Sequence, residues 1–148
     1  MTKTFTAQIQ AFADLTKQNL KYVAVESIQD VLEAAQTPQP SVKRTGGSFQ
    51  EGKIPVDTSE LINSLISGAN GSFGPESADS YAVALAGYEL GDYMRFGWTA
   101  PHAMRMEAGF TGTDAIGRTY NQPGRHFVGA NAARFSEFVM KHALEVRK

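Results

Sequence analysis

Two segments, His102-Ala-Met-Arg-Met-Glu-Ala-Gly-Phe110 and Gln122-Pro-Gly-Arg-His-Phe-Val128, flank a polar connection and set the architecture of the C-terminal half. In the first, Met104, Met106 and Ala108 alternate with other residues, which predicts a half-buried strand. The connection, residues 109–124, has no clear periodicity, and connections of this length are usually functional or disordered. The second segment opens a helix. We therefore expect a strand, a long loop and a helix.

The segment before this stretch predicts two further strands. In the first, large residues alternate with alanines; in the second, they alternate with Tyr93, Arg95 and Gly97. The large residues are Tyr81, Val83 and Leu85, and then Met94, Phe96 and Trp98. Short connections between successive strands favour an antiparallel meander.

Helices are expected at both ends of the chain. The first 36 residues contain no Gly or Pro, and apolar residues recur at helical spacing on one stripe. Such a helix either lies in the core or projects one end onto a neighbouring subunit. A second helix is predicted from Val128 to Val146. Its apolar positions, again at spacings of three and four, are Val128, Ala132, Phe135, Val139, Ala143 and Val146.

The region between the first helix and the strands contains a proline stop, a loop and a short helix. Thr37-Pro-Gln-Pro40 ends the first helix, because proline removes a donor. The glycine-rich loop that follows carries Lys43, Arg44 and Lys53, which either are simply solvated or meet nucleic acid or an acidic partner. Asp57 and Glu60 have the spacing of a capping box, which predicts a short helix through Ile66.

These elements form a single α+β domain. Its parts are a long helix (1–36), a loop (37–56), a short helix, sheet and long loop (57–128), and a C-terminal helix (129–148). We expect an antiparallel sheet of three to four strands with the C-terminal helix packed on it.

Composition excludes several classes of function. The chain has 148 residues, a formal net charge of −1 and no cysteine. Electrostatic binding to nucleic acid is therefore not favoured, and disulfides and thiolate metal sites are excluded. No signal sequence and no membrane span are expected, so we predict a soluble protein that is intracellular when made.

The residues needed for catalysis are not found together. His102, His126 and His142 fall in three different elements, and none has a second ligand at metal-binding spacing. Glu107, Asp114 and His126 have simpler roles at a strand end, a turn and a helix start. We expect no enzyme, no metal and no cofactor. Function is then assigned to loops and surfaces, whose candidate interface residues are Lys43, Arg44, Lys53, Phe110, Arg118, Tyr120 and Arg125.

Three pieces in order carry a family resemblance: Pro55-Val-Asp-Thr-Ser-Glu-Leu61, then the His102–Gly109 segment, then Gly124-Arg-His-Phe-Val128. The chain resembles the small tail-component family of siphophage-type tailed bacteriophages, the neck, head–tail joining or tail-completion proteins. Ser59 stands where that family usually has Gly, His102 where it has Tyr, and His126 where it has Pro. The matching positions are Asp57, Thr58, Leu61, Glu107, Gly109, Arg125 and Phe127.

The resemblance implies a structural virion protein, made in the bacterial host cytoplasm and built into a ring at the head–tail junction. A hexamer or dodecamer would contact connector, adaptor and tail proteins, and DNA would pass through its lumen without sequence-specific binding. The loops 41–53 and 109–124 would contact those partners or line the channel. Alternatives are a tail-terminator ring of similar fold, or a non-phage small-molecule-binding module or enzyme with a pocket around His102, Glu107 and His126.

Overall fold

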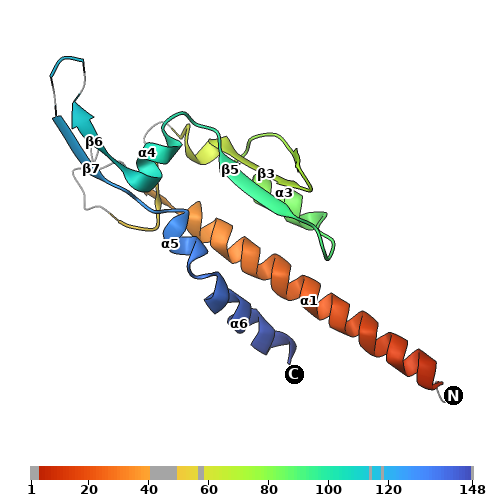
Figure 1. The fold of residues 1–148 in the computed structure, drawn as a ribbon. Helices are drawn as coiled ribbons and strands as arrows, with labels where there is room; N and C mark the ends of the chain where they lie inside the picture. Colours follow the sequence, from red (N-terminus) through yellow and green to blue (C-terminus); the bar gives the residue numbers. More distant parts are fainter. Residues whose placement is uncertain (1–3, 41–49, 57–58, 114, 118, 148) are drawn as a thin grey trace.

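The computed structural model describes residues 4–147 except 41–49, 57–58, 114 and 118. It is a mixed α+β fold, as expected, built around one long helix (Figure 1). This helix, α1 (Phe5–Ala35), is confirmed: nothing in its sequence interrupts a helix, and the Thr4 hydroxyl caps its start by accepting from the Ala7 amide at 3.1 Å.

A three-stranded antiparallel sheet lies beside α1. Its order is β4 (Ser72–Phe73), β3 (Leu65–Ala69), β5 (Met94–Trp98), so β3 is central and Leu65 pairs with Trp98. The strand expected over 94–98 is therefore confirmed. The expected meander is wrong, because its other two members are helices.

The segments 81–85 and 103–108 form α3 (Ser80–Ala86) and α4 (Ala103–Ala108) in place of strands. In α3, Tyr81 and Leu85 are four residues apart and share one face, where Leu85 is buried, whereas Val83 points outward and is 78% exposed. A window this short fits both periods, and packing of α3 against β3 and α1 selects the helix.

The short helix expected after Asp57 is also wrong. One 3-10 turn, η1 (Ile62–Ser64), is followed at once by β3, because all five residues from Leu65 pair with β5. That long-range pairing outweighs local helix preference. Asp57 and Thr58 lie outside the described residues.

The proline-containing segment after α1 is a strand. β1 (Pro38–Pro40) pairs in parallel with β2 (Ile54–Val56) in a separate two-stranded sheet. The buried Gln39 amide donates to the carbonyls of Gln50 and Lys53, both at 2.6 Å, which holds the described end of the loop against β1.

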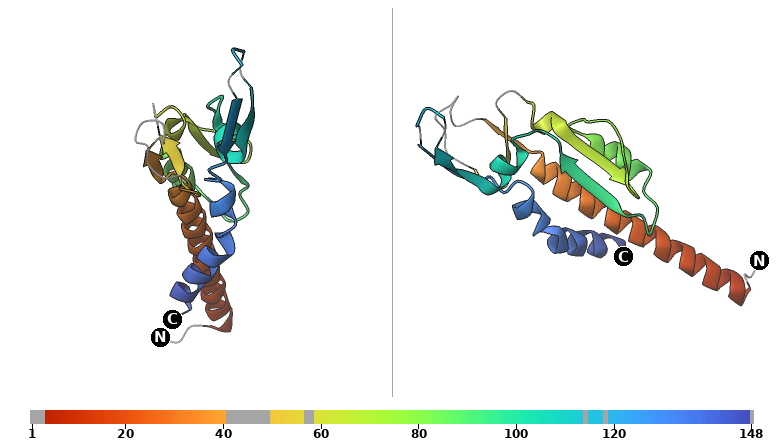
Figure 2. Two further views of the ribbon diagram at one scale, coloured as in Figure 1. Left: turned by 90° about the vertical axis from the view of Figure 1, so that its left-hand side faces the viewer. Right: turned by 45° about the horizontal axis from the view of Figure 1, so that its top comes forward.

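The C-terminal helix is divided into α5 (Gly129–Ala132) and α6 (Phe135–Val146). We expected it to pack on the sheet; its principal partner is α1, along which α6 lies (Figure 2). Phe138 and His142 are the residues of α6 buried in this packing.

The main hydrophobic cluster lies near the C-terminal end of α1, where β2, the end of β5, α4 and α5 converge. Trp98 packs edge-on against Phe127, with ring centroids 5.2 Å apart, and its indole donates to Gln36 at 2.8 Å. The buried members of the cluster are Ile54, Leu61, Ala100 and Phe127.

Candidate interaction surfaces

The segment 109–124, expected to be an irregular loop, is a β-hairpin that projects from the body (Figure 1). Its strands are β6 (Gly109–Thr113) and β7 (Thr119–Pro123), with Gly109 opposite Pro123. Outside the hairpin, its main contact is α4, where the Arg105 guanidinium lies 4.3 Å from the Phe110 ring centroid. We call residues 109–123 the arm. A two-stranded ribbon on its own is only marginally stable in water.

Glu107 fastens the base of the arm. Its carboxylate accepts the backbone N–H groups of Val128 at 2.9 Å and Gly129 at 2.8 Å, so it caps the start of α5 from a distant segment. Two backbone hydrogen bonds join the same segments: the Arg125 amide donates to the Met106 carbonyl at 2.7 Å, and the His126 amide donates to the Glu107 carbonyl at 3.1 Å. The chain entering the arm is thereby joined to the chain leaving it.

Two glycines allow these segments to approach so closely. Gly109 has φ +89°, and a Cβ there would lie 2.7 Å from both the Gln122 carbonyl oxygen and the Gly124 nitrogen. A Cβ at Gly124 would overlap the Glu107 carbonyl. The Glu107-Ala-Gly109 and Gly124-Arg-His-Phe127 pieces therefore meet in space and have a structural role as the base of the arm.

The other motif positions with a described side chain are core residues. Phe127 is 1% exposed and Leu61 is buried beside it in the main cluster. Arg125, expected at an interface, is buried within the chain: its guanidinium donates to the Pro123 carbonyl at 3.1 Å, and burial lowers its pKa. Arg125 therefore belongs to the base of the arm and not to an exposed contact surface.

The remaining predicted interface residues are distributed as follows. Lys53 is half-buried, and its neighbour Gly52 fixes it beside the base of the arm. The Gly52 amide donates to the Arg125 carbonyl at 2.7 Å, and the Asn131 side chain donates to the Gly52 carbonyl at 2.8 Å. Phe110 lies on the arm. Lys43, Arg44 and Arg118 lie outside the described residues, as does the side chain of Tyr120.

The alternative pocket around His102, Glu107 and His126 receives little support. Both oxygens of Glu107 hold backbone amides, so a general-base role would break the cap. His126 is exposed and adopts φ +50°. Among the described residues, no group of three or more His, Asp or Glu side chains could hold a metal ion.

A polar cluster that the sequence did not reveal joins α1 to α6. The buried His142 ring contacts Asp30 at 2.6 Å through Nε2 and Glu145 at 3.1 Å through Nδ1. Burial lowers the pKa of His142, but its hydrogen bonds to the two carboxylates outweigh burial and raise it overall. The Tyr22 hydroxyl donates to Glu145 at 2.6 Å, which raises the pKa of Tyr22 to about 12. Lys141 lies 3.7 Å from Asp30.

The N-terminal half of α1 extends beyond both the sheet and α6 (Figure 2). Its apolar side chains are exposed, including Phe5 at 78% and Phe12 at 70%. We call the exposed apolar set of this half the α1 stripe; it comprises Phe5, Ile9, Phe12, Leu15 and Leu20. Exposed large apolar side chains that gather on one helix are typical of an interaction site.

Compared with models of protein families, with curated proteins and with solved structures, the chain matches none. Within the described part of the chain, no helix is long and apolar enough to cross a membrane.

Proposed function

We propose that this chain is a structural subunit of the head–tail junction of a tailed bacteriophage, a neck or tail-completion component that assembles as a ring. The proposal joins the family resemblance of the sequence to the surfaces described above. In it, the chain has no catalytic role, and its partners are copies of itself together with connector, adaptor and tail proteins.

The α1 stripe is the observation that carries this proposal. It occupies several turns of a helix without Gly or Pro, so the helix has no hinge about which its free half could fold back onto the body. Another protein chain is then the natural cover for the stripe. A subunit whose apolar surface is left uncovered in isolation is typical of an obligate assembly.

The backbone supports the resemblance at one position and departs from it at another. Ser59 has φ +66°, in the left-handed region that favours Gly, and Gly is what the family usually has there. His126 replaces the family's usual Pro but has φ +50°, which proline cannot adopt. The turn into α5 must therefore differ locally from that of family members with Pro at this position.

In the assembled ring, we assign the arm to contacts with neighbouring proteins. Its base is fixed by the Glu107 cap and its far end is remote from the body, so it can reach across an interface (Figure 1). The same geometry would allow its tip to line a central channel through which DNA passes. The chain's net charge of −1 is compatible with passage of DNA without tight binding.

Sedimentation velocity and negative-stain microscopy of the purified chain test the assembly. We expect a hexameric or dodecameric ring, alone or on addition of the connector proteins encoded beside it. A chain that stays monomeric in both conditions contradicts the proposal. Neighbouring genes for portal, capsid and tail-tube proteins are expected, and cryo-EM of particles should place the ring against the connector; a ring seated on the tail-tube end would instead indicate a tail terminator.

A further inference from the structure

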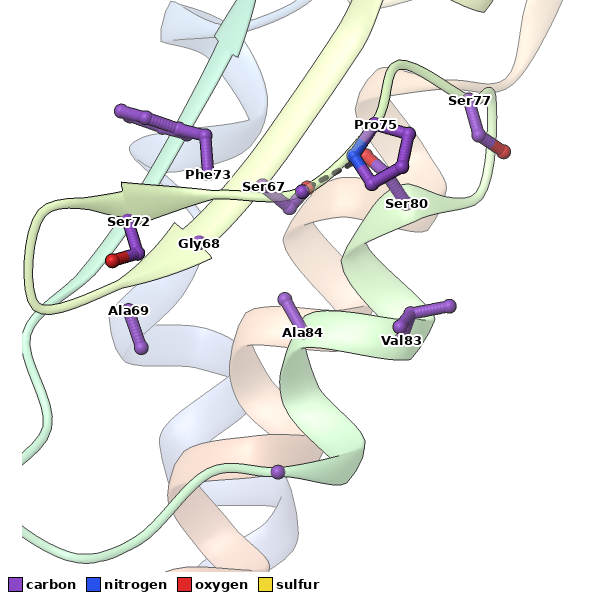
Figure 3. Close-up of a pocket in the computed structure, with 12 residues that line it drawn as sticks. Ser67, Gly68, Ala69, Ser72, Phe73, Pro75, Ser77, Ser80, Val83 and Ala84 are labelled. Carbon is purple, nitrogen blue, oxygen red and sulfur yellow. Dashed lines mark hydrogen bonds between the residues drawn. The ribbon is translucent and has the colours of Figure 1, made fainter.

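A groove opens between α3 and the β3–β4 hairpin, on a part of the fold not used by the arm or by α6 (Figure 3). Its volume is about 520 Å³, many times the roughly 30 Å³ that a water molecule occupies in the liquid. Its walls combine small residues with a few large apolar ones, among them Ala69, Phe73, Pro75, Val83 and Ala84.

The side chains that line the groove favour an apolar occupant. The two buried serines of its wall already satisfy each other, since the Ser67 and Ser80 hydroxyls are 2.8 Å apart and Ser80 also donates to the Leu65 carbonyl at 2.8 Å. Small-molecule sites usually add convergent polar groups that orient a ligand. Here the large side chains at the rim are apolar, since Val83 is 78% exposed and Phe73 is 42% exposed; the polar side chains beside them are the small Ser72 and Ser77.

The same chain carries an apolar helix surface that needs a cover. The α1 stripe cannot reach the groove of its own molecule, because α1 is one continuous rod whose free half points away from α3 (Figure 1). The stripe of a second molecule has no such restriction. Contact between two different patches of identical chains is heterologous, the kind that builds rings.

The area that the stripe offers is of the right order. A fully buried aromatic side chain contributes about 150–250 Å². With the exposures of Phe5 and Phe12, these two residues alone offer about 300 Å², more than a third of the roughly 800 Å² per partner in a standard interface. Ile9, Leu15 and Leu20 add to this.

We infer that the groove between α3 and the β3–β4 hairpin receives the α1 stripe of a second copy of this chain, joining the copies head to tail. The inference rests on the proposed self-assembly and specifies its contact, but it is independent of any place in a virion. Each copy then offers one stripe and one groove, and closure of the series covers all of them.

A pair of complementary variants tests the contact. Phe12→Asp disables the stripe and leaves the groove intact, whereas Val83→Asp does the reverse; both sites are exposed, so the fold should survive, which circular dichroism checks. Phe12→Ser and Val83→Ser replace them if either aspartate variant fails that check. Met140→Asp, at a site that is 68% exposed on α6, is the matched control for adding a charge to exposed apolar surface.

Sedimentation velocity should show that each aspartate variant alone needs at least about 30-fold more protein to assemble, as for loss of an interface hot spot. An equimolar mixture of the two should form a dimer and nothing larger, because one intact stripe meets one intact groove. Met140→Asp should assemble like the wild type.

The remaining outcomes overturn the inference in distinguishable ways. Normal assembly of Val83→Asp with loss in Phe12→Asp would show that stripes pair with each other and that the groove is not the receptor. Assembly that survives both substitutions, or a mixture that stays monomeric, would also reject the contact while leaving the ring possible. A wild-type chain that never self-associates would reject the ring proposal and the contact together.

Discussion

Replacing Glu107 by alanine should destabilise the fold at the base of the arm. The carboxylate accepts two backbone N–H groups, from Val128 at 2.9 Å and Gly129 at 2.8 Å. A lost helix cap costs about 1 kcal/mol, and each hydrogen bond to a charged group contributes about 1.5–3 kcal/mol. Because Glu107 is only half-buried, we expect a loss between the cost of a cap and the lower limit for two such bonds, about 2–3 kcal/mol.

Chemical denaturation followed by tryptophan fluorescence measures this loss directly. Trp98 is the sole tryptophan and packs against Phe127, immediately before the capped amides. For a chain of this length, 2–3 kcal/mol corresponds to a fall in melting temperature of about 4–12 °C. Measurements at several protein concentrations separate folding from self-assembly.

Two further variants sharpen the result. Glu107→Gln keeps one acceptor oxygen without the charge, so it should lose about half as much stability as Glu107→Ala. The exposed Glu137, which pairs with Arg134 at the surface, is the matched control, and Glu137→Gln should change the free energy of unfolding by less than about 0.5 kcal/mol. An alanine variant at Glu107 that stays within that same margin would refute the capping argument.

Three other variants probe the core, the arm and the polar cluster between α1 and α6. Phe127→Ala should lower the free energy of unfolding by about 3–5 kcal/mol in the same denaturation assay; a loss below about 1 kcal/mol would contradict its placement in the core. Gly109→Ala should destabilise more than Gly91→Ala, since both have positive φ but only at Gly109 would the Cβ meet backbone atoms; equal losses by calorimetry would argue against close approach at the arm's base. Because the pKa of His142 is raised in the folded state, its charge stabilises the fold fully below the unfolded pKa of 6.5, and this stabilisation is lost as the pH rises through the folded pKa. The pKa of Glu145 is lowered in the folded state, so the stabilisation from its carboxylate is lost only as the pH falls below the unfolded value of 4.5. The melting-temperature difference between wild type and His142→Gln should therefore be larger at about pH 5.5 than at about pH 8.5, and a difference independent of pH would contradict a stabilising charge on His142 in this polar cluster.

The elements that sequence reasoning recovered are those with long or unambiguous periodicity. α1 contains 31 residues without a helix breaker, and the alternation around Phe96 defines β5. The α+β class followed from these elements and from the C-terminal helix. Length made the difference, because a helical stripe repeated over many turns cannot be confused with a strand.

The elements that were missed depend on distant partners. Alternation at Val83 and at Met104 fits a short helix as well as a strand, and only packing against neighbouring elements decides between them. The arm resembles a loop in sequence although Phe110, Thr111 and Thr119 favour strands, since its glycines obscure the pattern. A helix was expected at Leu65 because no local feature announces the pairing of this residue with Trp98.

The candidate site divides in the same way. The sequence draws attention to the motif around Glu107, but its role as a cap for α5 depends on residues 21 positions apart that meet in space. The α1 stripe was visible as a pattern, and the sequence left open whether it faced a core or a neighbour. The groove beside Val83 was hidden, because the residues that form it were assigned to the wrong element.

The prolines of β1 hinder the addition of a further strand at the outer edge of the β1–β2 sheet. The Thr37 carbonyl accepts from the Ile54 amide at 3.1 Å, so backbone groups of alternate residues face β2 and those of Pro38 and Pro40 face outward. Neither proline has an N–H, so this edge of β1, with which no strand of the described residues pairs, offers no backbone donor to an incoming strand. Aggregation through β-strand pairing is thereby discouraged at this edge, although the same chain exposes the apolar α1 stripe.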